Sequence, residues 1–80
     1  MDDNEIYAGV AAVARDHLEW TQPLAPEMRL VEDLRLDSIR LLTLAVEVEN
    51  RFRVRLDEDE AGIVTVADLV AAVRRRLAVQ

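Results

Sequence analysis

The stretch DLRLDSIRLLTLAVEVENRFR, residues 33–53, decides the fold, because a polar loop ends inside it and a long apolar helical pattern begins. Four of its apolar residues recur at spacings of four, three and four, which places them on one face of a helix. They are Leu41, Ala45, Val48 and Phe52. We therefore predict a helix from about Ser38 to Arg53 with one buried face.

The same stretch carries a second apolar stripe, which consists of Ile39, Leu42 and Val46. A helix with two apolar stripes in so short a chain either sits centrally in the core or offers one stripe to a partner. Central packing is slightly favoured, since exposed apolar patches on soluble proteins are limited in size. The two arrangements are compatible with each other.

Outward from this stretch, helical spacing and capping residues predict further helices. Thr65 and Asp68 are close to a capping box and mark the start of the last one. Four helices are expected, over about residues 5–19, 38–53, 58–63 and 66–78. The predicted fold is an all-α, four-helix bundle with a short third helix, in a single domain over residues 1–80.

A long loop separates the first two predicted helices. Pro23 and Pro26 forbid a simple continuation of the first helix, and the loop extends to Asp37. Leu30 and Leu34 are expected to anchor it to the core. Connections of this length are uncommon in compact domains and are often functional.

Composition excludes several classes of protein. The chain of 80 residues has a net charge of −6, and its ten basic residues are all arginines. Apart from residues 74–76, which suit the end of a helix, they are dispersed, so nucleic acid is not expected as a partner. The absence of cysteine removes disulfides, thiol catalysis and zinc-thiolate sites.

Neither a membrane nor a metal is expected as a partner. No apolar run is long enough to span a bilayer and no signal segment is present, so a cytoplasmic protein is expected. Asp57, Asp59, Gly62 and Asp68 occupy positions of a calcium loop, but Ala61 and the short Asp68 side chain weaken that match. The sequence begins at Met1 and shows no flanking linkers, which favours a freestanding protein, expected to be a monomer.

Ser38 has a plain explanation as the residue that caps the predicted helix, because serine is common at this position. Its surroundings lack the Gly-x-Ser-x-Gly turn of a hydrolase. His17 lies on the apolar face of the first helix, where a partly buried histidine is expected, and nothing pairs it with Ser38. The residues by themselves leave Ser38 either a cap or a modified hydroxyl.

The order of these features resembles the acyl carrier protein family, from about Glu5 to Ala78. The most specific part is Asp33-Leu34 followed by Asp37-Ser38-Ile39, which is similar to the family's signature Asp-Leu-Gly-x-Asp-Ser-Leu around its phosphopantetheine attachment site. Residues 46–52 resemble the acid-rich end of the family's second helix, and residues 65–69 resemble the start of its fourth helix.

The resemblance implies that Ser38 is an attachment point and that the chain is not an enzyme. In this family a phosphopantetheinyl transferase joins the serine oxygen to the phosphate of 4′-phosphopantetheine, taken from coenzyme A. The thiol of that group then carries acyl chains as thioesters to acyl-loading and acyl-processing enzymes. A chain without cysteine can carry thioesters only through such a cofactor, and its phosphate would lie at a helix N-terminus, where negative charge is favoured.

The resemblance also implies a partner-recognition surface around Ser38. Its expected members are Arg35, Leu36, Asp37, Ile39, Arg40, Leu42, Thr43, Val46 and Glu47. Arg35 replaces the signature glycine, which removes easy access to a positive φ, and Arg40 stands where fatty-acid carriers often have an acid. We therefore expect a dedicated carrier in a polyketide, fatty-acid-like or other specialised pathway.

Two alternatives stay open. An aminoacyl carrier of the D-alanyl type can also show Leu-Asp-Ser, whereas Asp37 before Ser38 speaks against a peptidyl carrier. From a different class, the chain could be an unmodified helical adaptor that binds a partner helix through Ile39, Leu42 and Val46.

Overall fold

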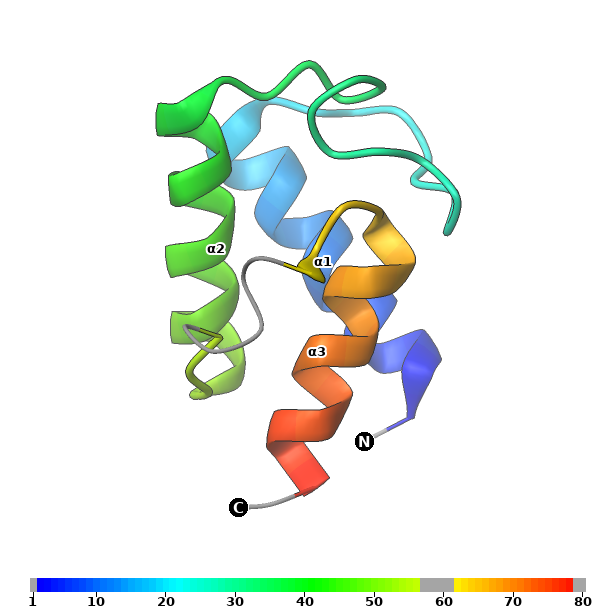
Figure 1. The fold of residues 1–80 in the computed structure, drawn as a ribbon, viewed down its shortest axis with the longest axis vertical. Helices are drawn as coiled ribbons and strands as arrows, with labels where there is room; N and C mark the ends of the chain where they lie inside the picture. The colour runs from blue at the N-terminus through cyan, green and yellow to red at the C-terminus, as the bar shows by residue number, and fades with distance from the viewer. Residues whose placement is uncertain (1, 57–61, 79–80) are drawn as a thin grey trace.

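A computed structural model of the chain describes residues 2–56 and 62–78. It contains three α-helices, which are α1 (Asp3–Leu18), α2 (Ser38–Phe52) and α3 (Val66–Ala78). Figure 1 shows α1 behind α3, with α2 running along their side, and the long loop between α1 and α2 crossing the end of the bundle at which α2 begins. The prediction of an all-α protein is confirmed, with no strand in the described ranges.

The helix bounds follow the capping residues. α1 begins two residues before the predicted position because the Asp2 carboxylate accepts the N–H of Glu5 at 2.9 Å. α2 ends at Phe52, since Arg53 adopts a left-handed conformation with φ of 57° and closes the helix. α3 has the predicted bounds. The expected short helix over residues 58–63 lies mostly outside the described residues.

The start of α3 confirms the predicted capping box. The Asp68 N–H donates to Thr65 Oγ1 at 3.1 Å, and the Thr65 N–H donates back to Asp68 Oδ2 at 3.0 Å. The same carboxylate oxygen accepts the N–H of Val64 at 3.0 Å. Hydrogen bonds from the backbone of Thr65, and then of Val64, hold the pKa of Asp68 below its ordinary value.

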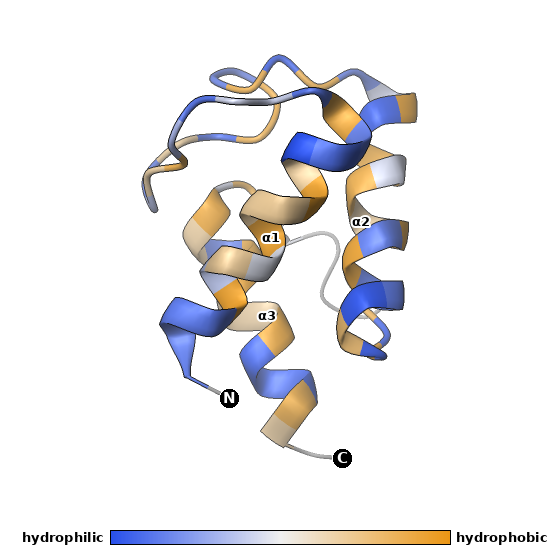
Figure 2. Ribbon diagram, turned by 180° about the vertical axis from the view of Figure 1, so that it is seen from behind, coloured by the Kyte–Doolittle hydropathy of each residue, from blue (hydrophilic) through white to orange (hydrophobic). Residues whose placement is uncertain are grey.

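The core is aliphatic apart from the ring of Phe52. Figure 2 shows hydrophobic residues on the side of α2 that faces α1 and α3, whereas the outer side of α2 carries both hydrophilic and hydrophobic residues. α1 and α2 approach closely at Gly9, where an added Cβ would collide with the Phe52 ring. Side chains from all three helices are fully buried, among them Ile6, Val10, Leu44, Val48, Val66 and Leu69.

Leucines fasten the long loop to this core. Leu30 and Leu34, the two expected anchors, are buried, and so is Leu36. The Leu30 N–H donates to the Val64 carbonyl at 2.9 Å, which ties the loop to the segment before α3. The loop therefore delivers the start of α2 in a fixed position.

The described chain has no helix long and apolar enough to cross a membrane. It also has no group of three or more acidic, histidine or cysteine side chains placed to hold a metal ion. Asp57 and Asp59 of the weak calcium-loop match lie outside the described residues.

Candidate functional site

Ser38 is the first residue of α2 and is exposed. It does not cap the helix. The cap is Asp37, whose Oδ1 accepts the N–H of Arg40 at 2.8 Å. The Ser38 hydroxyl forms no hydrogen bond with the part of the chain that the structure describes, so the explanation of this serine as a cap is wrong.

The backbone before Ser38 contains a strained residue. Arg35 has φ of 58°, in the left-handed region that glycine occupies most easily. Its neighbours Leu34 and Leu36 are each only 5% exposed, so the chain turns at Arg35 while both leucines enter the core. Arginine has no easy access to this conformation, yet Arg35 adopts it, at a cost of about 1–2 kcal/mol.

The first turn of α2 suits an anionic group on Ser38. The backbone N–H groups of Ser38 and Ile39 donate to no described residue, as expected at a helix N-terminus. This turn contains no acidic residue, whereas Arg40 is exposed in it. Free N–H groups, the helix dipole and a nearby guanidinium all favour a phosphodiester at this serine. The residues present therefore fit phosphopantetheine.

The second apolar stripe of α2 faces solvent. Ile39 is 77% exposed, Leu42 58% and Val46 40%. The slight preference for central packing is wrong for this stripe, because the core is filled by the other face of the helix. An apolar stripe beginning directly after Ser38 is a surface that a partner protein could cover.

Two further residues of the expected partner surface lie elsewhere. Leu36 is buried in the core, so it supports the loop and cannot contact a partner. Glu47 is half-buried, and its Oε1 lies 3.5 Å from Nε2 of His17 on α1. His17 is therefore exposed between the two helices, and the expectation that it would be partly buried on the apolar face is wrong.

The remaining members of the predicted partner surface lie in the loop before Ser38 and in the first turns of α2. Arg35, Asp37 and Arg40 are exposed, and Thr43 is half-buried. The Thr43 hydroxyl donates to the Ile39 carbonyl at 3.0 Å and is thus occupied within the helix. Around Ser38 the surface therefore combines two arginines, one capping carboxylate and an apolar stripe.

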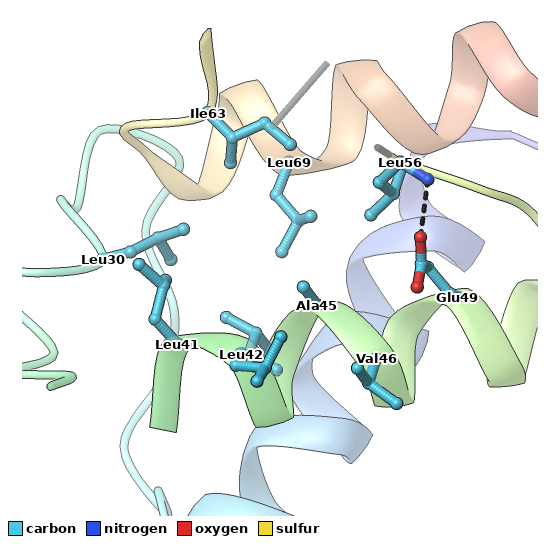
Figure 3. A pocket seen from close by; sticks show the side chains of 10 residues that line it. Leu30, Leu41, Leu42, Ala45, Val46, Glu49, Leu56, Ile63 and Leu69 are labelled. Carbon is cyan, nitrogen blue, oxygen red and sulfur yellow. Dashed lines mark hydrogen bonds between the residues drawn. The ribbon is translucent and has the colours of Figure 1, made fainter. Parts of the chain in front are cut away.

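A pocket of about 180 Å³ opens between α2, α3 and the segments that flank them. Figure 3 shows leucines from the loop, from α2 and from α3 pointing into it. Its lining consists of Leu30, Leu41, Leu42, Leu44, Ala45, Val46, Glu49, Leu56, Ile63 and Leu69. Leu42 and Val46 belong both to the exposed stripe and to the pocket wall, so the pocket opens beside that stripe.

The existence of a cavity could not be decided from the sequence, because it depends on how Leu44, Val48, Ile63 and Val66 pack, and the role of Glu49 was not predicted. The signal was present, because Glu49 follows Leu41 and Ala45 at spacings of four on one helix face. A carboxylate that follows apolar residues on the same helix face must either reach solvent or form a specific hydrogen bond or ion pair. The structure shows a contact: Glu49 Oε2 accepts the N–H of Leu56 at 2.7 Å.

Comparison with known proteins gives the family. A family model described as "Phosphopantetheine attachment site" matches residues 8–73. The meromycolate extension acyl carrier protein of Mycobacterium tuberculosis is 36% identical over 78 residues, which are 94% of this chain and 67% of the relative. That of Mycolicibacterium aurum is 36% identical over 74 residues, 89% of this chain and 75% of the relative.

A relative named simply acyl carrier protein gives the same result. The protein from Myxococcus xanthus is 35% identical over 68 residues, which cover 82% of this chain and 86% of the relative. The family match spans α2, most of α1 and α3, and the loop that leads to Ser38. The chain therefore belongs to the acyl carrier proteins, which bear a phosphopantetheine attachment site.

Proposed function

We propose that Ser38 is the attachment residue for 4′-phosphopantetheine. The proposal is supported chiefly by the start of α2, where Asp37 caps the helix. The exposed Ser38 hydroxyl is therefore not needed for capping. Ser38 is also the only serine in the sequence. In the proposed reaction the Ser38 oxygen bonds to the pantetheine-side phosphorus of coenzyme A while the phosphoanhydride bond between its two phosphates breaks. Adenosine 3′,5′-bisphosphate leaves, and the serine proton passes to a base of the transferase.

The chain itself would act as a carrier without catalysis of its own. Bound phosphopantetheine supplies a thiol, which the chain lacks because it has no cysteine. Ser38 fixes the group at one end of the bundle, and the N–H groups of the first turn stabilise its phosphate. The exposed position leaves the rest of the group free to reach other proteins.

The exposed stripe of Ile39, Leu42 and Val46 would receive the transferase and the enzymes that load and process the acyl chain. Arg35 and Arg40 flank this stripe, and neither forms an ion pair with a described residue. The two acidic residues of α2, Glu47 and Glu49, are half-buried and engaged in contacts of their own. A partner whose docking surface combines apolar residues with acidic side chains would complement this surface.

The pocket between α2 and α3 would shelter an aliphatic part of the cargo. Of the ten described residues that line it, nine are apolar, which suits an alkyl chain and disfavours a charged aminoacyl group. We therefore favour an acyl carrier over the aminoacyl alternative. The names of the mycobacterial relatives support a dedicated pathway of specialised lipid assembly.

The finer architecture is also a proposal. A short helix over residues 58–63 would complete the four-helix bundle, and residues 1–80 would form a single carrier domain. The agreement of the other three helices with their sequence-based bounds supports this arrangement.

Intact-mass analysis tests the function. After incubation with coenzyme A and a promiscuous phosphopantetheinyl transferase, the protein should gain the mass of one phosphopantetheine, and Ser38→Ala should gain none. Thr43→Ala is the matched control, because it removes a nearby hydroxyl that is occupied within the helix. No gain in mass, under conditions that modify another carrier, would leave the unmodified adaptor as the better description.

A further inference from the structure

Glu49 stands out among the described residues that line the pocket, because within residues 2–56 and 62–78 it is the only charged one. Its Oε2 accepts the N–H of Leu56 at 2.7 Å, and Figure 3 shows this contact at one side of the pocket. Leu56 is 2% exposed. The side chain of Glu49 therefore ties the C-terminal part of α2 to a buried residue of the following segment.

The backbone of Glu49 holds the same segment. Its carbonyl oxygen accepts the N–H of Arg53, which closes α2, and the N–H of Val54 at 3.1 Å. Val54 is buried as well. One residue thus fixes the chain from Arg53 to Leu56 against the helix, so the Glu49 side chain cannot swing out of the pocket without losing the contact to Leu56.

Among the pocket residues on α2, Leu41 lies nearest to Ser38 in the sequence and Glu49 lies farthest from it. Leu41 lies within the first turn after Ser38, and Glu49 follows Leu41 eight residues later. Eight residues of α-helix span about 12 Å. A chain entering beside Leu41 and running along α2 would therefore reach the Glu49 carboxylate after about nine carbons, since an extended alkyl chain advances about 1.3 Å per carbon.

We propose that Glu49 forms the end wall of this pocket and limits the length of the acyl chain that it shelters. This inference rests on the proposed function, in which the acyl chain starts from the group on Ser38. An alkyl chain pressed against the carboxylate would remove water from the charge and offer no hydrogen bond in return, which is unfavourable. Carbons beyond the end wall would remain in solvent or bind elsewhere.

The length dependence of stabilisation tests this. The holo-protein is loaded with saturated acyl chains of increasing length, and Tm is measured for each. Tm should rise with chain length and level off at about nine carbons. Glu49→Ala removes the wall, so its plateau should move to longer chains by about two carbons or more. Glu49→Gln removes the charge but keeps the length of the side chain, an acceptor for Leu56 and a polar amide that is also unfavourable to bury against an alkyl chain. Its plateau should therefore stay in place.

A second variant tests whether the acyl chain runs along α2 towards Glu49, and it leaves the contact between Glu49 and Leu56 in place. Ala45 lines the pocket one turn closer to Ser38. Ala45→Leu adds bulk there, so the plateau should move to shorter chains by about four carbons, the equivalent of one turn. Glu47→Ala is the matched control, because Glu47 contacts His17 outside the pocket lining and its plateau should equal that of the unmodified sequence.

The outcomes separate the two proposals. If no phosphopantetheine is attached at Ser38, no acylated protein forms and the proposed function fails. If the acylated proteins form but the plateau is the same with and without Glu49→Ala and Ala45→Leu, the end wall is refuted while the carrier function stands. A plateau that shifts in the expected opposite directions in these two variants supports the end wall.

Discussion

The carboxylate of Asp37 accepts the backbone N–H of Arg40 at 2.8 Å, and this contact caps α2. This contact affects the next residue, Ser38. A serine that caps a helix uses its side-chain oxygen to accept a backbone N–H of the first turn. Here the cap is supplied by Asp37, so the hydroxyl is available for chemistry without loss of helix stability.

Removal of the cap should destabilise the fold. Asp37→Ala leaves the N–H of Arg40 without this acceptor and should lower the free energy of unfolding by about 1 kcal/mol. Asp37→Asn retains an acceptor oxygen and should lower it by less. Urea denaturation of both variants measures the difference. If both lose equal stability, the charge of Asp37, and not its hydrogen bond, supports α2.

Relief of backbone strain at Arg35 should stabilise the protein. Arg35→Gly places a residue without Cβ at φ of 58°, which removes a penalty of about 1–2 kcal/mol, partly offset by the greater freedom of glycine in the unfolded chain. We expect a net gain of about 0.5–1 kcal/mol in urea denaturation. A net loss would mean that the Arg35 side chain makes a stabilising contribution larger than the strain.

The capping box of α3 should contribute to stability in a way that depends on pH. The folded-state pKa of Asp68 is lowered, chiefly by hydrogen bonds from the Thr65 backbone. Its contribution is therefore complete above the unfolded pKa of about 3.9, and it is lost as pH falls through the lower folded pKa. Thermal unfolding should show a smaller loss of Tm below about pH 4 in Asp68→Asn than in the unmodified protein. An identical dependence of Tm on pH in the two proteins would contradict the lowered pKa of Asp68.

The exposed stripe of α2 should matter for partners and little for folding. Ile39 is 77% exposed, so Ile39→Asp should change the free energy of unfolding by only about 0.5 kcal/mol. If the transferase docks on the stripe, kcat/KM for phosphopantetheine transfer should fall about tenfold, which corresponds to about 1.4 kcal/mol. Val31→Asp, at a residue that is 54% exposed outside the stripe, is the control. An equal fall in kcat/KM in both variants would mean that the transferase does not dock on the stripe.

The three helices that the structure describes could be predicted from the sequence, because apolar spacing and capping residues agreed with each other. α3 begins at Val66 and ends at Ala78, as the capping box and the apolar face indicated. The choice between Asp37 and Ser38 as the cap could not be predicted, since both residue types are good caps. Only the backbone conformation of the loop decides which of them precedes the first turn.

Other details depended on tertiary packing. The positive φ of Arg35 follows from the burial of Leu34 and Leu36 on either side of it, a requirement that outweighs the local preference of arginine. His17 keeps its helical spacing from Val13 but lies at the end of α1, where Leu18 fills the core instead. The pocket depends on how α2, α3 and the segments that flank them pack together, and the apolar spacing within one helix does not reveal that packing.

Peptide mapping after phosphopantetheine transfer determines which residue carries the group. Cleavage after Arg35 and Arg40 releases residues 36–40, which contain the only serine of the chain. This peptide should carry the added phosphopantetheine on Ser38, and no other peptide should carry it. Modification of a different peptide, or an unmodified 36–40 peptide from protein that has gained the mass, would contradict attachment at Ser38.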